Sequence, residues 1–382
     1  MLNQMAPGIK TICAVLNGPN ANYGLNASNN KVSNSSFSIT QEDARIEYTG
    51  DQIMSTGTGT SATVRLRATI LDISAVPGDA AYDPAAGDIR KAKVRFVNGE
   101  TRVPLSGWLP VTLVAGDTRV GLVTYDTVIT LGSTETDREL NFGIEVNNGY
   151  YVRNSSADNT VVTVYKPVGD FITGGGHIVP DKSVGTFKSD VNTKTNFGFN
   201  VKYNKKGTSL QGNMNIIFRR TESDGVLHTY QIKANAMQTL AVNATNPLQQ
   251  TAQFTSKANL TDVTNPLAPV TKTGNKTLYV YMTDRGDPGT LDSISFVLVE
   301  TGSNTGVLAN ILYSSEWVSN KNSQKGLRGG NLVVKSGFNL STTSPLTSGR
   351  SSTGDLSTTS ESLARNEAPA ARFGIRAYPN SS

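Results

Sequence analysis

Residues 171–207 read FITGGGHIVPDKSVGTFKSDVNTKTNFGFNVKYNKKG, and this stretch decides how the chain is divided. From residue 197 to residue 203, aromatic and aliphatic side chains alternate with small or polar ones. Such alternation is typical of a β-strand that has one buried face and one solvated face. The stretch therefore predicts the boundary and the first strands of a β-module.

The three glycines at residues 174–176 raise a second interpretation, a phosphate-binding loop. Such a loop needs the pattern GxxxxGK[ST] between a strand and a helix. Here His177 follows the glycines, and neither the lysine nor a helical pattern is present. We therefore interpret the glycines as a turn or bulge at which backbones pass closely.

The residues that follow continue as strands, and we expect a second β-sandwich over residues 169–336. Ser223-Asp224-Gly225 lies between two alternating runs and predicts a long hairpin. Five further strands are expected at residues 251–260, 277–282, 293–300, 311–317 and 331–334.

Residues 41–168, before the opening stretch, follow the same pattern. Residues 62–70 alternate strictly, and the dipeptides Asn98-Gly99 and Asn148-Gly149 suit the positive φ angles of tight hairpin turns. Regular short strands without a helical period predict an immunoglobulin-like β-sandwich. Residues 1–40 are too few for a sandwich, so we interpret them as the remnant of a preceding β-module.

The end of the chain has a different composition. Residues 337–372 contain almost no large apolar side chains and cannot bury enough surface to offset their chain entropy, so we expect a flexible linker. Residues 373–382 begin like a strand and then break off. The predicted fold class is all-β, with two tandem β-sandwiches, the first immunoglobulin-like, and a disordered C-terminal tail.

Composition argues against several functional classes. The formal net charge is +5, but the basic residues are scattered, so no nucleic acid is expected as a partner. No apolar run approaches the ~20 residues needed to span a bilayer, so membrane insertion is not expected. The first residues lack an apolar region followed by a cleavage site, so we expect a missing export signal or a piece of a larger precursor.

Catalytic chemistry has few candidates. Cys13 is the single cysteine, which excludes an intrachain disulfide and a Cys/His zinc site, and we interpret it as a small buried residue. His177 and His228 are the two histidines, each interpreted as a packed or solvated residue, and no GxSxG elbow occurs. We therefore expect no enzyme, no catalytic residues and no bound cofactor.

Two acidic loops are the candidate metal sites. Calcium prefers six to eight oxygen ligands, which Asp- and Gly-rich loops at sandwich ends supply. Aspartate also simply favours turns, and structural turns are the preferred interpretation of both loops. The calcium candidates are Asp79, Asp83, Asp88, Asp284, Asp287 and Asp292.

Two passages resemble known families. Residues 173–176, 196–199, 202–207 and Gly212 match the Thr-Gly-Gly-Gly opening, the Asn-Phe-Gly-Phe motif, the Lys-rich turn and the Gly-led strand of a domain from secreted bacterial multidomain proteins. His177 stands where relatives usually carry an aromatic residue. The passages ARIEYTGD, ATVRLRAT, GDIRKAKVRFVN and GYYVRNSSADNTVVTVYKP resemble the immunoglobulin-like repeat that commonly precedes that domain.

The last residues, FGIRAYPNSS, resemble the beginning of a type IX secretion sorting domain, which typically opens with Tyr-Pro-Asn-Pro. Tyr378, Pro379 and Asn380 match, whereas Ser381 replaces the second proline and the rest of that domain is absent. The resemblance implies a secreted or cell-surface protein.

Together these observations predict a non-enzymatic structural or adhesive module of a large secreted or cell-surface bacterial protein. Its expected partners are neighbouring modules of the same protein, a cell-surface glycan or an extracellular polymer. The alternative is a carbohydrate-binding accessory region of an extracellular hydrolase. A row of exposed aromatic residues among Trp108, Tyr150, Tyr151 and Trp317 would favour sugar stacking, and burial of these residues would favour a spacer.

Overall fold

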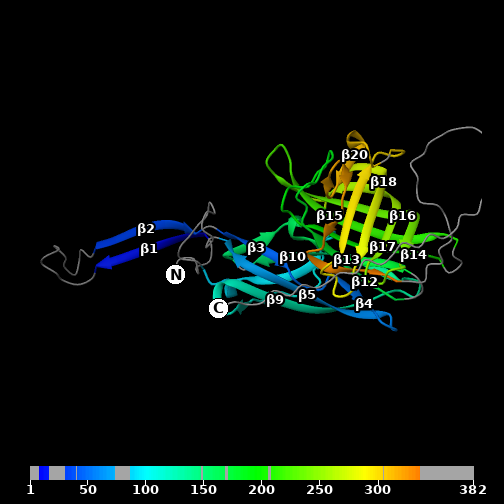
Figure 1. Ribbon diagram of the computed structural model, residues 1–382. Coiled ribbons are helices and arrows are strands. Elements are labelled where there is room, and N and C mark those ends of the chain that lie inside the picture. Colours follow the sequence, from blue (N-terminus) through cyan, green and yellow to red (C-terminus); the bar gives the residue numbers. More distant parts are fainter. Residues whose placement is uncertain are drawn as a thin grey trace, which may run out of the picture. The chain divides into compact units, whose positions relative to one another are not determined.

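The computed structural model confirms the all-β class (Figure 1). Three single-turn helices, η4 (Ile89–Lys91), η5 (Ser156–Asp158) and η6 (Leu308–Asn310), are the helical elements among the described residues. No helix in that part of the chain is long and apolar enough to cross a membrane. The structure describes residues 8–16, 31–39, 41–73, 87–147, 149–167, 171–204, 208–303 and 305–335.

The first strands form a separate antiparallel hairpin. β1 (Gly8–Leu16) pairs with β2 (Lys31–Ile39), and Cys13 lies opposite Asn34 in the register. This hairpin lies within residues 1–40, which the sequence indicated to be the remnant of a preceding β-module. Its assignment to a preceding module stays a prediction.

Residues 41–167, which we call the first module, fold as a sandwich with immunoglobulin-like strand order. One layer runs β3 (Glu42–Tyr48), β5 (Ser61–Asp72), β9 (Asp117–Thr130) and β8 (Thr112–Val114). The other layer runs β4 (Ile53–Ser55), β12 (Thr160–Tyr165), β10 (Asp137–Asn147) and β6 (Lys93–Asn98), with β7 (Leu109–Pro110) and β11 (Tyr151–Asn154) beside it. In immunoglobulin terms these layers are ABED and CFG, and the short β4 pairs in parallel with the last strand.

The core of the first module follows from the alternation in the sequence. On β5, Val64, Leu66, Ala68 and Ile70 are fully buried, while the residues between them face solvent. They pack with apolar residues of β10, including Phe142. Each large apolar side chain buried in this way contributes about 1.5–3 kcal/mol.

The turn after β6 differs from the expected tight hairpin. The Asn98 side chain accepts hydrogen bonds from the backbone N–H groups of Glu100 and Thr101, which opens a wider turn. The residue with positive φ is Arg102, at 60°, and its guanidinium is held by Glu145 at 3.0 Å. Asparagine therefore acts here through its side chain and not through the backbone angle of an Asn-Gly pair.

Residues 171–335, the second module, form one continuous antiparallel sheet that curls over its own core. The ring stacks Phe197–Phe199 and Phe218–Tyr230 are both buried in that core. Figure 1 shows β18 and its neighbour crossing steeply over β14–β16. The sheet runs β20 (Ile311–Ser314), β19 (Ser293–Val299), β18 (Val270–Asp284), β17 (Gln250–Asp262), β16 (Leu227–Asn243), β15 (Leu210–Thr221), β14 (Thr195–Tyr203), β13 (Phe171–Ile178) and β24 (Gly329–Val334).

Short elements complete the second module. β23 (Lys325–Gly326) pairs with β19, and β21 (Trp317–Val318) pairs with β22 (Lys321–Asn322). The hairpin expected around Ser223-Asp224-Gly225 is confirmed, with Gly225 at a φ of 79° between β15 and β16. Glycine is the residue that adopts this angle without strain.

The two modules meet along a contact that we call the seam, where β10 and β12 of the first module pack against β13, β14 and β15 of the second. β12 is buried on both faces: Val162 and Val164 enter the core of the first module, whereas Val161 and Thr163 face away from it. That second face of β12 and β10 packs against β13, β14 and β15. The described residues of both modules belong to one compact unit.

Candidate functional site

The triple glycine belongs to the seam. Gly175 on β13 lies directly opposite Gly198 on β14, and Thr163 of the first module lies over the pair. A Cβ on Gly175 would meet the Gln52 carbonyl oxygen at 2.3 Å, and one on Gly198 would meet Thr163 Oγ1 at 2.4 Å. The glycines lie inside the regularly paired strand β13, so the expected turn or bulge is wrong. The expected close backbone approach is present, and at Gly175 the partner backbone comes from the other module.

Hydrogen bonds reinforce this contact. The buried Thr163 hydroxyl donates to the Gly174 carbonyl at 3.1 Å. On β14, Asn196 donates to the Thr160 hydroxyl at 3.2 Å. These polar groups are buried and satisfied across the seam, which fixes the register between the two modules.

Arg219, on β15, is a buried charged residue in the seam. Its Nε donates to the Ala157 carbonyl at 3.0 Å, and its Nη2 donates to the Asn159 carbonyl at 2.5 Å, both in the first module. Within its own module it donates to Lys194 O at 2.8 Å and to the Asn196 side chain. Burial lowers its pKa to about 10, so the group remains charged at neutral pH.

Ion pairs and a histidine surround the seam. Lys194 Nζ lies 2.9 Å from Glu47, and Lys233 Nζ lies 2.7 Å from Glu100, each pair joining the two modules. The side-chain amide Nε2 of Gln52, in the first module, donates a hydrogen bond to His177 Nδ1 at 3.0 Å. Burial lowers the pKa of His177 to about 4, so the imidazole is neutral above that pH.

Glu139, on β10 facing the seam, is a half-buried acid that forms no ion pair with any described basic residue. Its Oε1 and the Oδ2 of neighbouring Asp137 are buried atoms with no protein hydrogen-bond partner among the described residues. Burial and, secondarily, the Asp137 charge raise the pKa of Glu139 to about 8. A protonated Glu139 beside Asp137 accounts for both buried oxygens, because the protonated carboxyl of Glu139 donates a hydrogen bond and the carboxylate of Asp137 accepts it.

Replacing this acid should change the pH dependence of stability. The folded-state pKa of Glu139 lies above its value in an unfolded chain. The stability that its protonated form contributes is therefore fully present below about pH 4.5 and is lost as the pH rises toward 8. Glu139→Gln cannot ionise. We expect it to gain on the order of 2–3 kcal/mol over the wild type between pH 5 and pH 8, measured by urea unfolding.

The control for that measurement is Glu300→Gln, which removes a half-exposed carboxyl paired with Lys276 in the second module. This variant should track the wild type across the same pH range. Equal pH profiles for the Glu139→Gln variant and the wild type would contradict a protonated Glu139 in the seam.

The second acidic loop holds the last strand of the sheet in place. Asp292 is fully buried, and its Oδ2 accepts the backbone N–H of Leu332 at 2.9 Å. Asp284 accepts the N–H of Val334 at 2.8 Å, and Asp287 accepts from the side chain of Asn331. All three calcium candidates of this loop therefore contact β24 or its side chains, a role beyond the local turn structure expected for them.

The first acidic loop is described only in part. Asp88 caps η4, accepts the N–H of Arg90 and pairs with its guanidinium, which lowers the Asp88 pKa. Asp79 and Asp83 lie outside the described residues. Among the residues that are described, no three His, Cys, Asp or Glu side chains gather as a metal site requires. Calcium binding at either loop stays a prediction.

A histidine–carboxylate contact was not expected from the sequence. His228 Nδ1 lies 2.8 Å from Asp262, and its Nε2 lies 3.7 Å from Asp224. The hydrogen bond with Asp262 is the main cause that raises the His228 pKa. His228 therefore belongs to an ion cluster with Asp262 and Asp224.

The four aromatic residues proposed for sugar stacking do not form a row. Tyr150 and Tyr151 are buried in the first core, and the Tyr151 hydroxyl donates to Asp72 at 2.7 Å. Trp108 is 42% exposed, but the Arg95 guanidinium lies over its ring at 4.5 Å. Trp317 packs against a small cluster of the second module that includes Val297.

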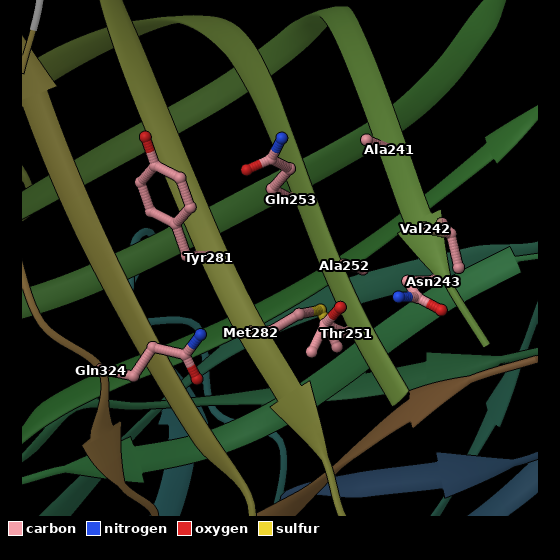
Figure 2. A pocket seen from close by; sticks show the side chains of 9 residues that line it. All are labelled: Ala241, Val242, Asn243, Thr251, Ala252, Gln253, Tyr281, Met282 and Gln324. Atoms are coloured by element: carbon pink, nitrogen blue, oxygen red, sulfur yellow. The ribbon is translucent and has the colours of Figure 1, made fainter. Parts of the chain in front are cut away.

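A different aromatic residue lines two depressions on the surface of the second module. Tyr281 projects from the outer face of β18, directly opposite Gln253 on β17, as Figure 2 shows. On its other side Tyr281 pairs with Ser295 of β19. Depressions of about 300 Å³ and 440 Å³ lie to either side of Tyr281, and both are also lined by Gln324.

Side-chain amides line both depressions, together with hydroxyl and apolar side chains. Gln324 Oε1 accepts the hydroxyls of Thr283 at 2.8 Å and Ser293 at 2.7 Å, which fixes the direction of its amide. Asn322 donates to Ser295 Oγ at 2.7 Å. Burial raises the pKa of Tyr281, so its phenol stays neutral. The surface thus offers side-chain amides and hydroxyls around one aromatic ring, and Lys321 is the one charged lining residue in the described part of the chain.

Comparison with known proteins identified no matching family model, no matching curated protein and no matching solved structure.

Proposed function

We propose that this protein is a non-enzymatic structural module of a large secreted or cell-surface protein, in which two β-sandwiches act as one rigid spacer. The observation that carries the proposal is the seam. Tandem domains usually meet through small, polar and mobile contacts. Here the contact includes a buried Arg219 and a glycine pair that fits Thr163, so the modules are expected to move as one body.

The surface location rests on the resemblances to secreted multidomain proteins and to the start of a sorting domain. It is tested by labelling intact cells of the source organism with an antibody against residues 41–335. Labelling without permeabilisation is expected. Labelling that appears only after the envelope is opened would refute the surface assignment and leave the rigid seam as a separate claim.

The second candidate function is a carbohydrate-binding accessory region. The aromatic residues first considered for this role are buried or capped. The depressions around Tyr281 favour it instead, because one partly exposed ring with several side-chain amides is a lining suited to the apolar faces and the hydroxyls of sugars.

A further inference from the structure

We propose that the two depressions around Tyr281 form one binding site for a neutral oligosaccharide, a disaccharide or longer. The proposal rests on the second candidate function and gives it a place and a ligand class. It adds a binding role to the spacer and does not depend on the seam.

The charge of the lining selects a neutral ligand. Lys321 is the only charged side chain that lines either depression among the described residues. Phosphate and carboxylate ligands are recognised by several cations or by bidentate arginines, and such groups are not gathered here. Sugar hydroxyls, which both donate and accept, match amides and hydroxyls.

The amides that face the site are preorganised by hydrogen bonds to neighbouring residues. The two hydroxyls that donate to Gln324 Oε1 leave its N–H groups for a ligand. Asn243 is held in the same way, because its Oδ1 accepts the Thr245 hydroxyl at 2.7 Å and the Thr245 backbone N–H at 3.2 Å. Donors fixed before binding cost less conformational entropy when a ligand arrives.

The arrangement of the depressions sets the length of the ligand. Ala241, Gln253, Tyr281 and Ser295 lie in one row across four neighbouring strands. Tyr281 stands in the middle of this row and lines both depressions. A saccharide chain that stacks on the ring therefore reaches amides on both sides, whereas a single sugar unit reaches those of one side.

The test is isothermal titration of the full chain with neutral oligosaccharides (cellohexaose, xylohexaose and mannohexaose), with glucose as the short ligand and polygalacturonate as the charged one. We expect at least one neutral hexasaccharide to bind and glucose to bind much more weakly. Tyr281→Ala should weaken binding about tenfold or more, and Gln253→Ala should weaken it less. Tyr203→Ala, which removes another partly exposed tyrosine of the same sheet, is the matched control.

Thermal unfolding of each variant separates lost binding from lost folding. Binding that survives in a folded Tyr281→Ala variant, or that falls equally in Tyr203→Ala, would overturn the site. No heat with any neutral hexasaccharide, or preference for polygalacturonate, would overturn the ligand class. None of these results bears on the rigid spacer, which is tested by comparing the unfolding midpoints of the two modules.

Discussion

Gly175→Ala should destabilise the protein by about 2–3 kcal/mol although it adds only one methyl group. The new Cβ would lie 2.3 Å from the Gln52 carbonyl oxygen, which is itself bonded to the Thr163 N–H at 2.9 Å. Because this neighbour is backbone within a strand pair of the first module, it cannot move aside without breaking the seam. Urea unfolding at pH 7 measures the loss.

Gly107→Ala is the control, because a Cβ there meets nothing within 4 Å and Gly107 does not adopt a positive φ. Alanine lowers the entropy of the unfolded chain, so this control should be neutral or stabilising by up to about 1 kcal/mol. Gly198→Ala should behave like Gly175→Ala, since its Cβ would meet Thr163 Oγ1 at 2.4 Å. Equal stability of all three variants would refute close packing at the seam.

Arg219→Met should cost about 3–5 kcal/mol, the largest effect that we expect from a single substitution. Methionine fills a similar volume but donates no hydrogen bond. The carbonyls of Ala157 and Asn159 in the first module would lose their charged donor. A buried acceptor without a donor costs about 1–3 kcal/mol, and several are affected at once.

Two further variants separate charge from geometry at this position. Arg219→Lys keeps the charge but loses the planar fork, so it should be intermediate in stability. Arg65→Met removes an exposed arginine that pairs with Asp126 and should cost less than about 1 kcal/mol. A stability loss for Arg219→Met no greater than that of Arg65→Met would contradict its proposed role.

Much of the fold was predictable because alternation is a local signal. The strand at residues 62–70 and the hairpin around Gly225 follow directly from side-chain periodicity and turn residues. The curl of the second sheet does not, because it brings Asp284 and Asp292 into contact with β24 across a long sequence separation. The same aspartates were therefore interpreted as turn or calcium residues.

The seam and the Tyr281 surface were harder to predict, for two different reasons. Thr163 and Val161 are buried by the second module, and no local pattern shows which neighbour covers a strand. Tyr281 belongs to a strand that was expected at residues 277–282, and its alternation with Val280 and Met282 places it on the outer face. The amides that surround it come from other strands and loops, which only the register brings together.

The most direct test of a single rigid unit uses the two tryptophans of the chain, Trp108 in the first module and Trp317 in the second. The single-tryptophan variants Trp108→Phe and Trp317→Phe each report on one module by fluorescence during urea unfolding. We predict that both probes give the same midpoint in the full chain, because neither module keeps its structure once the seam opens. Two separate midpoints would contradict a single rigid unit and would show that the two modules unfold independently.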